Sequence, residues 1–523
     1  MKKIFYLTLV ISISLFAACK KSSNNKTNTN PTAPSKIGTT LQLVQDSIWL
    51  YAKEDYLWFN QLPSYVQFGP RTFTDPDPLT ALTKEMDALS QYAINPATSS
   101  PYEQSTLDPG TAKYSFIDDG TESAALNGVK GDFGFDVQYN LWNDLRVEYA
   151  YAGSPAGLAG IHRGDMITSI NGSTKITYDS GIYGDGSGTN LNYVSNAIYN
   201  SKTITMALTR TDGTTYTASL NTANYNVNPI LKDTVVTDSA GHKVGYLVFN
   251  TFIDNNVADP LLDAAFAQFA TNGITDLVVD LRYNGGGYVA TAEHLDDLLV
   301  PASKNGTLMY NTYYNSNLVS GKDPLLGYQW RVINGTDVNY GEFSYTVADN
   351  VTNFAKKGSL NINRVFFIIT GQTASASELT INNLRPEMDV QFIGEQSYGK
   401  PVGFFDIDIN KYIMFTPEFS VQNSADQGGY YGGFTPGNGY PGVNDYDDLT
   451  KDWGDPTEGL LADVLRYTYK ATYIKPAGAV KNKGLNQVSF AAATPKRNLP
   501  NKHKFTGMIG KKTSLLNILK KNR

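Results

Sequence analysis

The pattern of hydrophobic and polar positions divides the chain into three parts with different periodicities. From about residue 40 until Pro63, and again over about residues 78–92, apolar side chains recur every three or four positions, as they do along one face of a helix. Over residues 125–225, short segments alternate apolar and polar residues between turn signals, which predicts a β-rich domain. From about residue 228 onward, continuous apolar runs alternate with amphipathic stretches, which predicts an α/β core with parallel strands.

The strands of the α/β core are predicted from continuous apolar runs, because a strand buried on both faces of a sheet has no polar side. Such runs occur at residues 244–249, 276–281 and 365–370, and further strands are predicted at 390–394, 406–409 and 413–421. Helices are expected at residues 261–270, 289–299 and 456–469, and from residue 374. The sequence therefore predicts a multidomain α/β fold with an N-terminal helical region, a β-rich domain and an α/β core whose sheet is partly parallel.

Length and composition agree with several folded domains. A chain of 523 residues is too long for one ordinary hydrophobic core. Hydrophobic residues make up 41% and charged residues 18%, and the net charge of −6 gives no reason to expect a nucleic-acid partner. We divide the chain into a signal peptide (1–18), a tether (19–39), a helical region (40–122), a β-rich domain (123–225), an α/β core (226–472) and a basic tail (473–523).

The N-terminus has the pattern of a secretion signal. Lys2 and Lys3 precede an apolar run over residues 4–16, and two alanines lead to Cys19. Cys19 is the only cysteine of the chain, which excludes an intramolecular disulfide. Residues 20–36 are rich in Ser, Asn, Thr and Lys and predict a flexible tether. No later segment approaches the roughly 18 apolar residues that span a membrane.

The C-terminal tail is strongly basic. Beyond residue 471 it contains about a dozen Lys and Arg residues and no Asp or Glu. We interpret it as a loosely held, solvated tail. Its last part, residues 514–521, also fits a basic amphipathic helix that would contact anionic lipid or glycan.

Ser375 lies at the transition from a predicted buried strand to a predicted helix. At such a turn a hydroxyl projects beside the free backbone N–H groups of a helix N-terminus. The spacing of Ser375 and Glu378 also fits a capping box, in which the hydroxyl only satisfies a helix-end amide. Lys400 follows in the turn 397–401, where a lysine on its own is usually solvated.

Both positions belong to a recognisable pattern. The run Thr-Ala-Ser-Ala-Ser-Glu at 373–378, followed by Tyr-Gly-Lys at 398–400, resembles the signature of the C-terminal processing peptidases. These tail-specific proteases are serine–lysine endopeptidases. The resemblance implies that Ser375 is the nucleophile and that Lys400, which lies 25 positions on, is its base. Better-known members carry a glutamine four residues after the lysine, where this chain has Phe404; Gln372 or Gln396 could take its place.

The turn after the strand at 276–281 resembles a second motif of the same family. Its sequence, Asp-Leu-Arg-Tyr-Asn-Gly-Gly-Gly over residues 280–287, allows a backbone to approach a reacting group closely. The resemblance implies that the amide of Gly286 or Gly287, together with that of Ala376, binds the oxyanion. A phosphate-binding loop is the rival interpretation, but no Gly-Lys-Ser/Thr follows. We interpret Asp280 and Arg282 as structural partners.

The β-rich domain resembles a PDZ domain of the bacterial protease type. The resemblance rests on the run Arg-Gly-Asp-Met-Ile-Thr-Ser-Ile-Asn-Gly at 163–172 and on Phe133, Gly134 and Phe135. It implies that the amides around Gly134 and Phe135 receive a chain-terminal carboxylate, while the next strand adds the peptide to a sheet edge. The alternative is that Phe133 and Phe135 are ordinary core residues.

The end of the signal sequence resembles a bacterial lipobox, whose cysteine becomes the acylated N-terminus. This implies lipidation of Cys19 and a place in the cell envelope, at an outer membrane and facing the periplasm. Phe16 stands where a leucine is more usual. A plain signal peptide with cleavage nearby is the alternative.

These residues lead to one catalytic hypothesis. An ordinary lysine with a pKa of about 10.4 is protonated at pH 7 and cannot accept the proton of a serine. Lys400 must therefore be desolvated, so that its neutral amine is populated. We expect Ser375 to attack a peptide carbonyl and Lys400 to take its proton. Expected partners are polypeptides with free C-termini and a membrane.

Two other interpretations stay open. His294, on the helix after the glycine turn, is the plausible histidine for a Ser–His arrangement, although a solvated helix position is the alternative. A catalytically idle, peptide-binding lipoprotein is favoured by the missing glutamine at Phe404. No clustered His, Cys and carboxylate spacing suggests a zinc site, so no metal or cofactor is expected.

Overall fold

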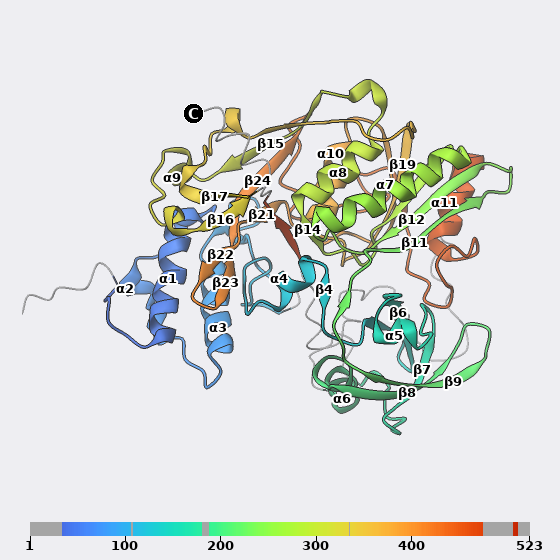
Figure 1. The fold of residues 1–523 in the computed structure, drawn as a ribbon, viewed down its shortest axis with the longest axis horizontal. Coiled ribbons are helices and arrows are strands. Elements are labelled where there is room, and N and C mark those ends of the chain that lie inside the picture. Colours follow the sequence, from blue (N-terminus) through green and yellow to red (C-terminus); the bar gives the residue numbers. More distant parts are fainter. Residues whose placement is uncertain (1–33, 106–107, 180–187, 334, 474–505, 511–523) are drawn as a thin grey trace, which may run out of the picture.

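The computed structural model describes residues 34–105, 108–179, 188–333, 335–473 and 506–510 (Figure 1). It confirms the predicted multidomain α/β fold class. In Figure 1 the N-terminal helices lie to the left of the α/β core, and the β-rich domain lies below it. The predicted signal peptide and most of the tether, with Cys19, lie outside the described residues. No helix in the described ranges combines the length and apolarity needed to cross a membrane.

The N-terminal region is helical, as predicted, and is joined to the core by a strand. Its helices and 3-10 turns are α1 (Thr40–Asp55), η1 (Phe59–Gln61), α2 (Tyr65–Phe68), η2 (Pro70–Thr72), α3 (Pro78–Ser90) and α4 (Thr121–Leu126). Strands β1 (Ile94–Asn95) and β2 (Ser100–Pro101) pair with each other. Strand β3 (Phe116–Asp118) instead pairs with β23 (Tyr412–Phe415), which itself pairs with β22 (Ile407–Ile409). The region therefore packs as part of the core.

The β-rich domain has its own sheet and its own hydrophobic core. The strand order is β5-β6-β7-β8-β9, all antiparallel, so that β5 lies at one edge. The strands are β5 (Phe135–Leu141), β6 (Asp144–Ala150), β7 (Met166–Ile170), β8 (Thr203–Thr209) and β9 (Thr215–Asn221). The helices are α5 (Pro155–Leu158), α6 (Thr189–Ser195) and η3 (Asn196–Asn200). Where the chain enters and leaves the domain, β4 (Val129–Lys130) pairs with β10 (Tyr225–Asn226).

The α/β core contains a six-stranded sheet in the order β11-β12-β13-β19-β20-β25. Only β11 and β12 are antiparallel, so the sheet is partly parallel, as predicted. The strands are β11 (Ile230–Thr237), β12 (Lys243–Phe249), β13 (Asp276–Asp280), β19 (Arg364–Ile369), β20 (Asp389–Gly394) and β25 (Gly442–Asn444).

Both faces of this sheet are covered, which explains the continuous apolar runs. On one face, Val279 and Phe367 share a cluster with the helices α7 (Asn255–Asn272), α8 (Val289–Leu299) and α10 (Ala376–Leu384). On the other face, Val278 and Phe366 pack with α11 (Gly459–Lys470). Figure 1 shows α11 on the side of the sheet away from α7, α8 and α10.

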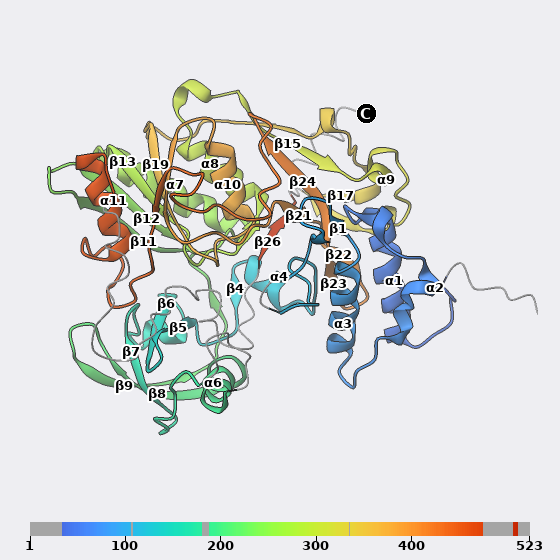
Figure 2. The same cartoon turned by 180° about the vertical axis from the view of Figure 1, so that it is seen from behind.

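A second six-stranded sheet has the order β14-β26-β21-β24-β15-β18. Its strands are β14 (Gly286–Tyr288), β26 (Gly507–Ile509), β21 (Val402–Phe404), β24 (Pro417–Asn423), β15 (Leu308–Tyr314) and β18 (Val351–Asn353). The interpretation of the tail as loosely held is wrong for residues 506–510, because β26 lies between β14 and β21. Figure 2 shows β26 next to β21. The possible helix at 514–521 lies outside the described residues.

Two further differences from the predicted elements concern the same half of the chain. The single strand predicted at 413–421 is interrupted at Thr416, and its two parts, β23 and β24, join different sheets. Residues 300–363, for which the pattern gave no prediction, form β15, β18 and smaller elements. These are η4 (Ala302–Lys304), α9 (Ser316–Val319), η5 (Leu326–Tyr328), β16 (Trp330–Ile333), β17 (Thr336–Asn339), η6 (Tyr340–Glu342) and η7 (Val347–Asp349).

Candidate active site

Ser375 occupies a strained position at the N-terminus of α10. Its backbone has φ 61° and ψ −108°, and a non-glycine residue with positive φ is costly for the backbone. The side chain is fully buried, and its Oγ has no hydrogen-bond partner among the described residues. Glu378 reaches back to the Ser375 amide, as in a capping box, at 3.0 Å. Among the described residues the Ser375 hydroxyl therefore makes no structural hydrogen bond, which leaves it available for a chemical role.

Glu378 connects the Ser375 turn to the loop that carries Lys400. Its Oε2 accepts from the amides of Ser375 and Lys400, at 3.0 and 2.8 Å. Its Oε1 accepts from the Gly399 amide at 2.7 Å and from the Ser397 hydroxyl at 2.6 Å. Burial raises the pKa of Glu378, while these hydrogen bonds act in the opposite direction. One buried carboxylate therefore fixes both candidate catalytic backbones.

Lys400 is fully buried in the turn just before β21, with 0% of its surface exposed. Burial lowers the pKa of its amine well below the usual value, although Glu103, Glu378 and Glu418 oppose that effect. The Nζ atom lies 3.6 Å from the centroid of the Phe404 ring. The amine donates a hydrogen bond to the backbone carbonyl of Thr506, in the tail segment that contains β26. The environment thus favours the neutral amine that a general base requires.

The N-terminal region supplies neighbours of Lys400 that the sequence analysis did not identify. The Tyr114 hydroxyl donates to the Gly399 carbonyl at 2.6 Å, and the Lys113 amine contacts the same oxygen at 3.2 Å. Burial lowers the pKa of Lys113 to about 8. Glu103 is fully buried and accepts hydrogen bonds from Tyr56 and Ser115. These residues fall between predicted helices, without a periodic pattern that would have marked them.

The glycine turn lies against the Ser375 turn. A Cβ atom on Gly286 would come within 2.9 Å of the Ala376 amide nitrogen, so the two backbones approach closely. Gly286 has φ 105°, and its amide already donates to Asn284 Oδ1 at 2.9 Å. Gly287 has φ 140° and could not carry a side chain, because a Cβ would meet the Phe252 carbonyl oxygen at 2.0 Å. Because the Gly286 amide is engaged, the Gly287 amide, which lies in the pair of β14 with β26, is the remaining candidate for the oxyanion donor.

Asp280 and Arg282 lie in a buried ion-pair cluster, in agreement with the structural role predicted for them. Arg282 pairs with Asp280 at 2.7 Å, with Asp447 at 2.6 Å and with Glu458 at 2.9 Å. Arg163, from the β-rich domain, also pairs with Asp447 at 2.5 Å. The two arginines hold the pKa of Asp447 well below its usual range despite burial. The cluster therefore connects the β-rich domain to the glycine turn.

The residues considered as alternative partners of Ser375 and Lys400 have other contacts. His294 lies 2.8 Å from Asp263 Oδ1 and 2.7 Å from Lys357 Nζ, and neither contact involves Ser375. The side chain of Gln372 donates to Glu148 in the β-rich domain, at 3.0 Å. The side chain of Gln396 donates to the Gly432 carbonyl. Neither glutamine bond reaches the Lys400 amine, which packs on Phe404 instead.

The loop at residues 133–135 is largely engaged within the β-rich domain. Gly134 has φ 81°, and its amide donates to Asp132 Oδ1 at 2.7 Å. Its carbonyl accepts from the Tyr151 amide at 2.9 Å. Phe133 and Phe135 are buried in the domain core. A carboxylate that binds the Gly134 amide would have to displace Asp132.

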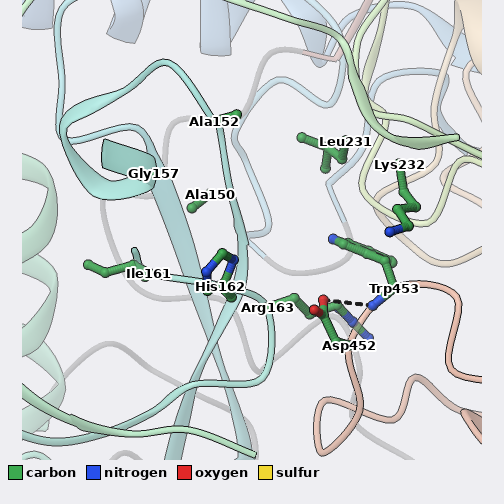
Figure 3. A pocket seen from close by; sticks show the side chains of 10 residues that line it. All are labelled: Ala150, Ala152, Gly157, Ile161, His162, Arg163, Leu231, Lys232, Asp452 and Trp453. Carbon is green, nitrogen blue, oxygen red and sulfur yellow. Dashed lines mark hydrogen bonds between the residues drawn. The ribbon is translucent and has the colours of Figure 1, made fainter. Parts of the chain in front are cut away.

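A cavity of about 350 Å³ lies between the β-rich domain and the α/β core, where Arg163 stacks on Trp453 (Figure 3). The Arg163 guanidinium carbon is 4.1 Å from the ring centroid. Figure 3 shows the lining side chains, which are Ala150, Ala152, Gly157, Ile161, His162, Arg163, Leu231, Lys232, Asp452 and Trp453. Neither Ser375 nor Lys400 belongs to this lining, so the cavity is separate from the candidate active site.

One stretch of the chain contains, in this order, the glycine turn, Ser375 and Lys400. Residues 243–421 match the sequence profile of Peptidase family S41. The S41 domain defined by this match contains the whole candidate active site except its N-terminal neighbours and the tail segment 506–510. Among curated proteins, none matches this chain.

Solved structures resemble the whole chain more loosely. A Bacteroides fragilis protein described as an S41 protease shares 22% identity with a TM-score of 0.52, over 82% of this chain and 97% of its own. The photosystem II D1 C-terminal processing protease shares 17% identity with a TM-score of 0.40, over 78% and 93% of the two chains. Mature CPAF shares 12% identity with a TM-score of 0.44, over 84% and 100%. The first of these resemblances supports the S41 fold beyond residues 243–421.

Proposed function

We propose that this protein is a serine endopeptidase in which Ser375 is the nucleophile and Lys400 is the general base. The observation that carries the proposal is the fully buried Lys400 amine, whose pKa is lowered by burial and whose backbone is fixed to that of Ser375 through Glu378. Among the described residues no carboxylate forms an ion pair with the Lys400 amine, and a buried lysine without such a partner is costly for stability, which argues for a chemical purpose.

The reaction divides into two proton-coupled steps. Ser375 Oγ attacks the carbonyl carbon of a peptide bond while its proton passes to the neutral Lys400 amine. Lys400 then gives that proton to the leaving nitrogen as the C–N bond breaks, and an ester to Ser375 remains. Water, deprotonated by the again neutral amine, hydrolyses the ester and restores the hydroxyl.

The negative charge that develops on the carbonyl oxygen needs donors fixed in advance. The Ala376 amide, at the N-terminus of α10, lies beside the glycine turn. Together with Gly287 it is our proposed oxyanion site, since the Gly286 amide is already bound to Asn284. Removal of one such donor typically costs about 10²–10³-fold in turnover.

The proposed activity is tested with the purified protein and an unstructured polypeptide substrate. Ser375→Ala should reduce cleavage to the background rate, and Lys400→Ala should reduce it by about 10²–10⁴-fold, the usual contribution of a general base. Ser424→Ala and Lys411→Ala, which change exposed residues of the same types, are the matched controls. Cleavage by the Ser375→Ala variant at the wild-type rate would reject the mechanism.

The idle peptide-binding lipoprotein remains the second candidate, favoured by Phe404 at the glutamine position. A serine-directed fluorophosphonate separates the two. Labelling of the wild type but not of Ser375→Ala supports the peptidase. No labelling, combined with tight binding of carboxylate-ended peptides, supports the binder.

Recognition of chain ends by the β-rich domain is a further part of the proposal. It is supported by the position of β5 at a sheet edge, directly after Gly134. The Ser375→Ala variant should bind a peptide with a free C-terminus more tightly than its amidated form. A ligand must displace the Asp132 carboxylate from the Gly134 amide, and a terminal carboxylate replaces that acceptor better than a neutral amide does. Equal affinity for the two peptides would argue against end recognition.

We also propose that the protein is lipid-anchored at Cys19 and acts outside the cytoplasm, at an outer membrane. The support is the charged and apolar pattern of residues 2–18 before a single cysteine. Metabolic labelling with a fatty-acid probe should mark the wild type and not Cys19→Ser. Labelling of both would place the anchor elsewhere.

A further inference from the structure

The strand β26 occupies the position next to the glycine turn. It runs parallel to β14, with Gly507 opposite Gly286 and Met508 opposite Gly287. The Gly507 amide donates to the Gly285 carbonyl at 3.0 Å, and the Gly510 amide donates to the Phe404 carbonyl at 2.8 Å. Figure 2 shows β26 beside β21, the strand that starts after Lys400. The tail segment 506–510 thus bridges the two elements that hold the candidate oxyanion donor and the candidate base.

The tail segment is seated in the core rather than laid on the surface. Met508 has 0% of its surface exposed, and Ile509 has 3%. Both belong to the large hydrophobic cluster that includes Phe404, and β26 contacts α10, the helix that begins after Ser375. Burial of these two apolar side chains stabilises the seated segment and offsets the cost of ordering it.

Backbone carbonyls of the tail segment lie at the reacting groups. The Thr506 carbonyl accepts a hydrogen bond from the Lys400 amine. The Ser375 hydroxyl has no hydrogen-bond partner among the described residues. The Gly507 carbonyl oxygen lies 2.3 Å from the point where a Cβ atom on Gly286 would stand, and that same point is 2.9 Å from the Ala376 amide. An extended peptide backbone thus lies across the atoms that the proposed reaction uses.

We infer that the position between β14 and β21 is the binding site for an extended polypeptide substrate, and that residues 506–510 of the chain occupy it as an internal pseudosubstrate that keeps the enzyme latent. The claim of latency rests on the proposed peptidase function, whereas the claim of a peptide-binding site does not. A substrate must displace β26 and pair with β14 in its place. The close approach requires glycine at position 286, because a Cβ atom there would meet the Gly507 carbonyl oxygen of the pseudosubstrate backbone.

Substitution of Met508 tests this inference. Met508→Asp places a charge in a fully buried position and should release the segment, while Met508→Leu keeps an apolar side chain of similar volume and is the matched control. In the active protein, Met508→Asp should raise kcat/KM on an unstructured polypeptide on the order of tenfold, because only molecules with a free site can bind substrate. Met508→Leu should stay at the wild-type rate. An equal or lower rate for Met508→Asp would overturn latency.

A measurement independent of activity separates this inference from the proposed function. In the Ser375→Ala background, Met508→Asp should increase amide hydrogen exchange at residues 286–288 and 402–404, and a synthetic peptide of residues 504–510 should restore protection. Unchanged exchange in Met508→Asp, or no effect of the peptide, would overturn the binding site. Protection restored by the peptide in a protein without peptidase activity would keep the site and reject only the catalytic proposal.

A covalent variant covers the case in which Met508→Asp does not fold. Tyr288 and Ile509 are directly opposite each other in the parallel pair. With Cys19 replaced by Ser, Tyr288→Cys combined with Ile509→Cys should form a disulfide under mild oxidation, detected as a loss of two hydrogens by mass spectrometry. The oxidised protein should be inactive and should recover on reduction. Failure of the disulfide to form in the folded protein would overturn the seating of the tail.

Discussion

The backbone amides of Ser375 and Lys400 donate to one oxygen atom, Oε2 of Glu378, at 3.0 and 2.8 Å. The two residues come from different parts of the fold, the N-terminus of α10 and the turn before β21, yet a single buried carboxylate sets their separation. The other oxygen of Glu378 fixes the turn just before Lys400. The geometry of the proposed dyad is thus determined by a residue that takes no part in the reaction.

We expect Glu378→Gln to damage both the site and the fold. Because every partner of this carboxylate is a donor, an amide NH₂ in place of one oxygen faces donors that it cannot satisfy. The free energy of unfolding should fall by about 1–3 kcal/mol, the cost of buried unsatisfied groups. Turnover should fall by about 10²-fold, as expected for misplaced reacting groups. Urea unfolding and steady-state kinetics measure the two effects, and the exposed Glu342→Gln is the control.

The rate of peptide cleavage should rise with pH through the lowered pKa of Lys400 and then level off, because only the neutral amine accepts a proton. Lys113 contributes to that lowering through its like charge. Lys113→Met should therefore raise the pKa of Lys400 and move the acidic limb of the pH–rate profile to higher pH. Lys113→Arg keeps the charge and should leave the limb in place. A shift of the limb to lower pH in Lys113→Met would contradict this assignment.

The positive φ of Ser375 predicts a difference between two inactive variants. Both Ser375→Ala and Ser375→Gly lack the nucleophile, but glycine adopts φ near 61° without the strain of a side chain. Ser375→Gly should therefore be more stable than Ser375→Ala by about 1 kcal/mol, at the lower end of the usual cost of such backbone strain. Denaturant midpoints at a single pH give the comparison. Equal stability would show that the surroundings hold the turn without strain.

The ion-pair cluster at Asp447 predicts an effect on domain association and on acid stability. Arg163→Ala removes one of two buried guanidinium groups and should cost about 3 kcal/mol, as for other broken buried pairs. Arg210→Ala, at a partly exposed arginine of the same domain, should cost less than about 1 kcal/mol.

The pH dependence of this contribution has a definite sign. Because the folded pKa of Asp447 is depressed, its stabilising effect is complete above the ordinary Asp pKa of about 3.9. The effect is lost as the pH falls below that value toward the depressed folded pKa. Arg163→Ala should therefore reduce the difference in unfolding free energy between pH 7 and pH 3. Urea titrations at the two pH values provide the measurement.

The sequence predicted the α/β core well because its strands are apolar on both faces. Residues 289–299 form α8 with the predicted bounds, and β19 and β20 lie within a residue of their predicted starts. The helix predicted at 261–270 extends over Asn255–Asn272 and contains Pro260 in its interior. The hydrophobic pattern therefore predicted elements best in the sheet that is covered on both of its faces.

Prediction was weaker where long-range pairing decides the structure. No local pattern indicates that residues 507–509 join a sheet beside Gly286, because each of these residues finds its partner more than 200 positions away in the chain. The same holds for Glu103, Lys113 and Tyr114, whose importance arises only from their place beside Lys400. Local sequence identified Ser375 and Lys400 through a motif, but not the groups that surround the amine.

Residues of the N-terminal region cover Lys400, and a shortened form of this protein would lose that cover. Tyr114 and Glu103 belong to residues that precede the S41 match, and β3 attaches that segment to β23. Without these residues, water would reach the Lys400 amine and raise its pKa toward the ordinary value, so the amine would stay protonated at neutral pH. A fragment limited to the matched region would then keep every motif residue and still be chemically silent.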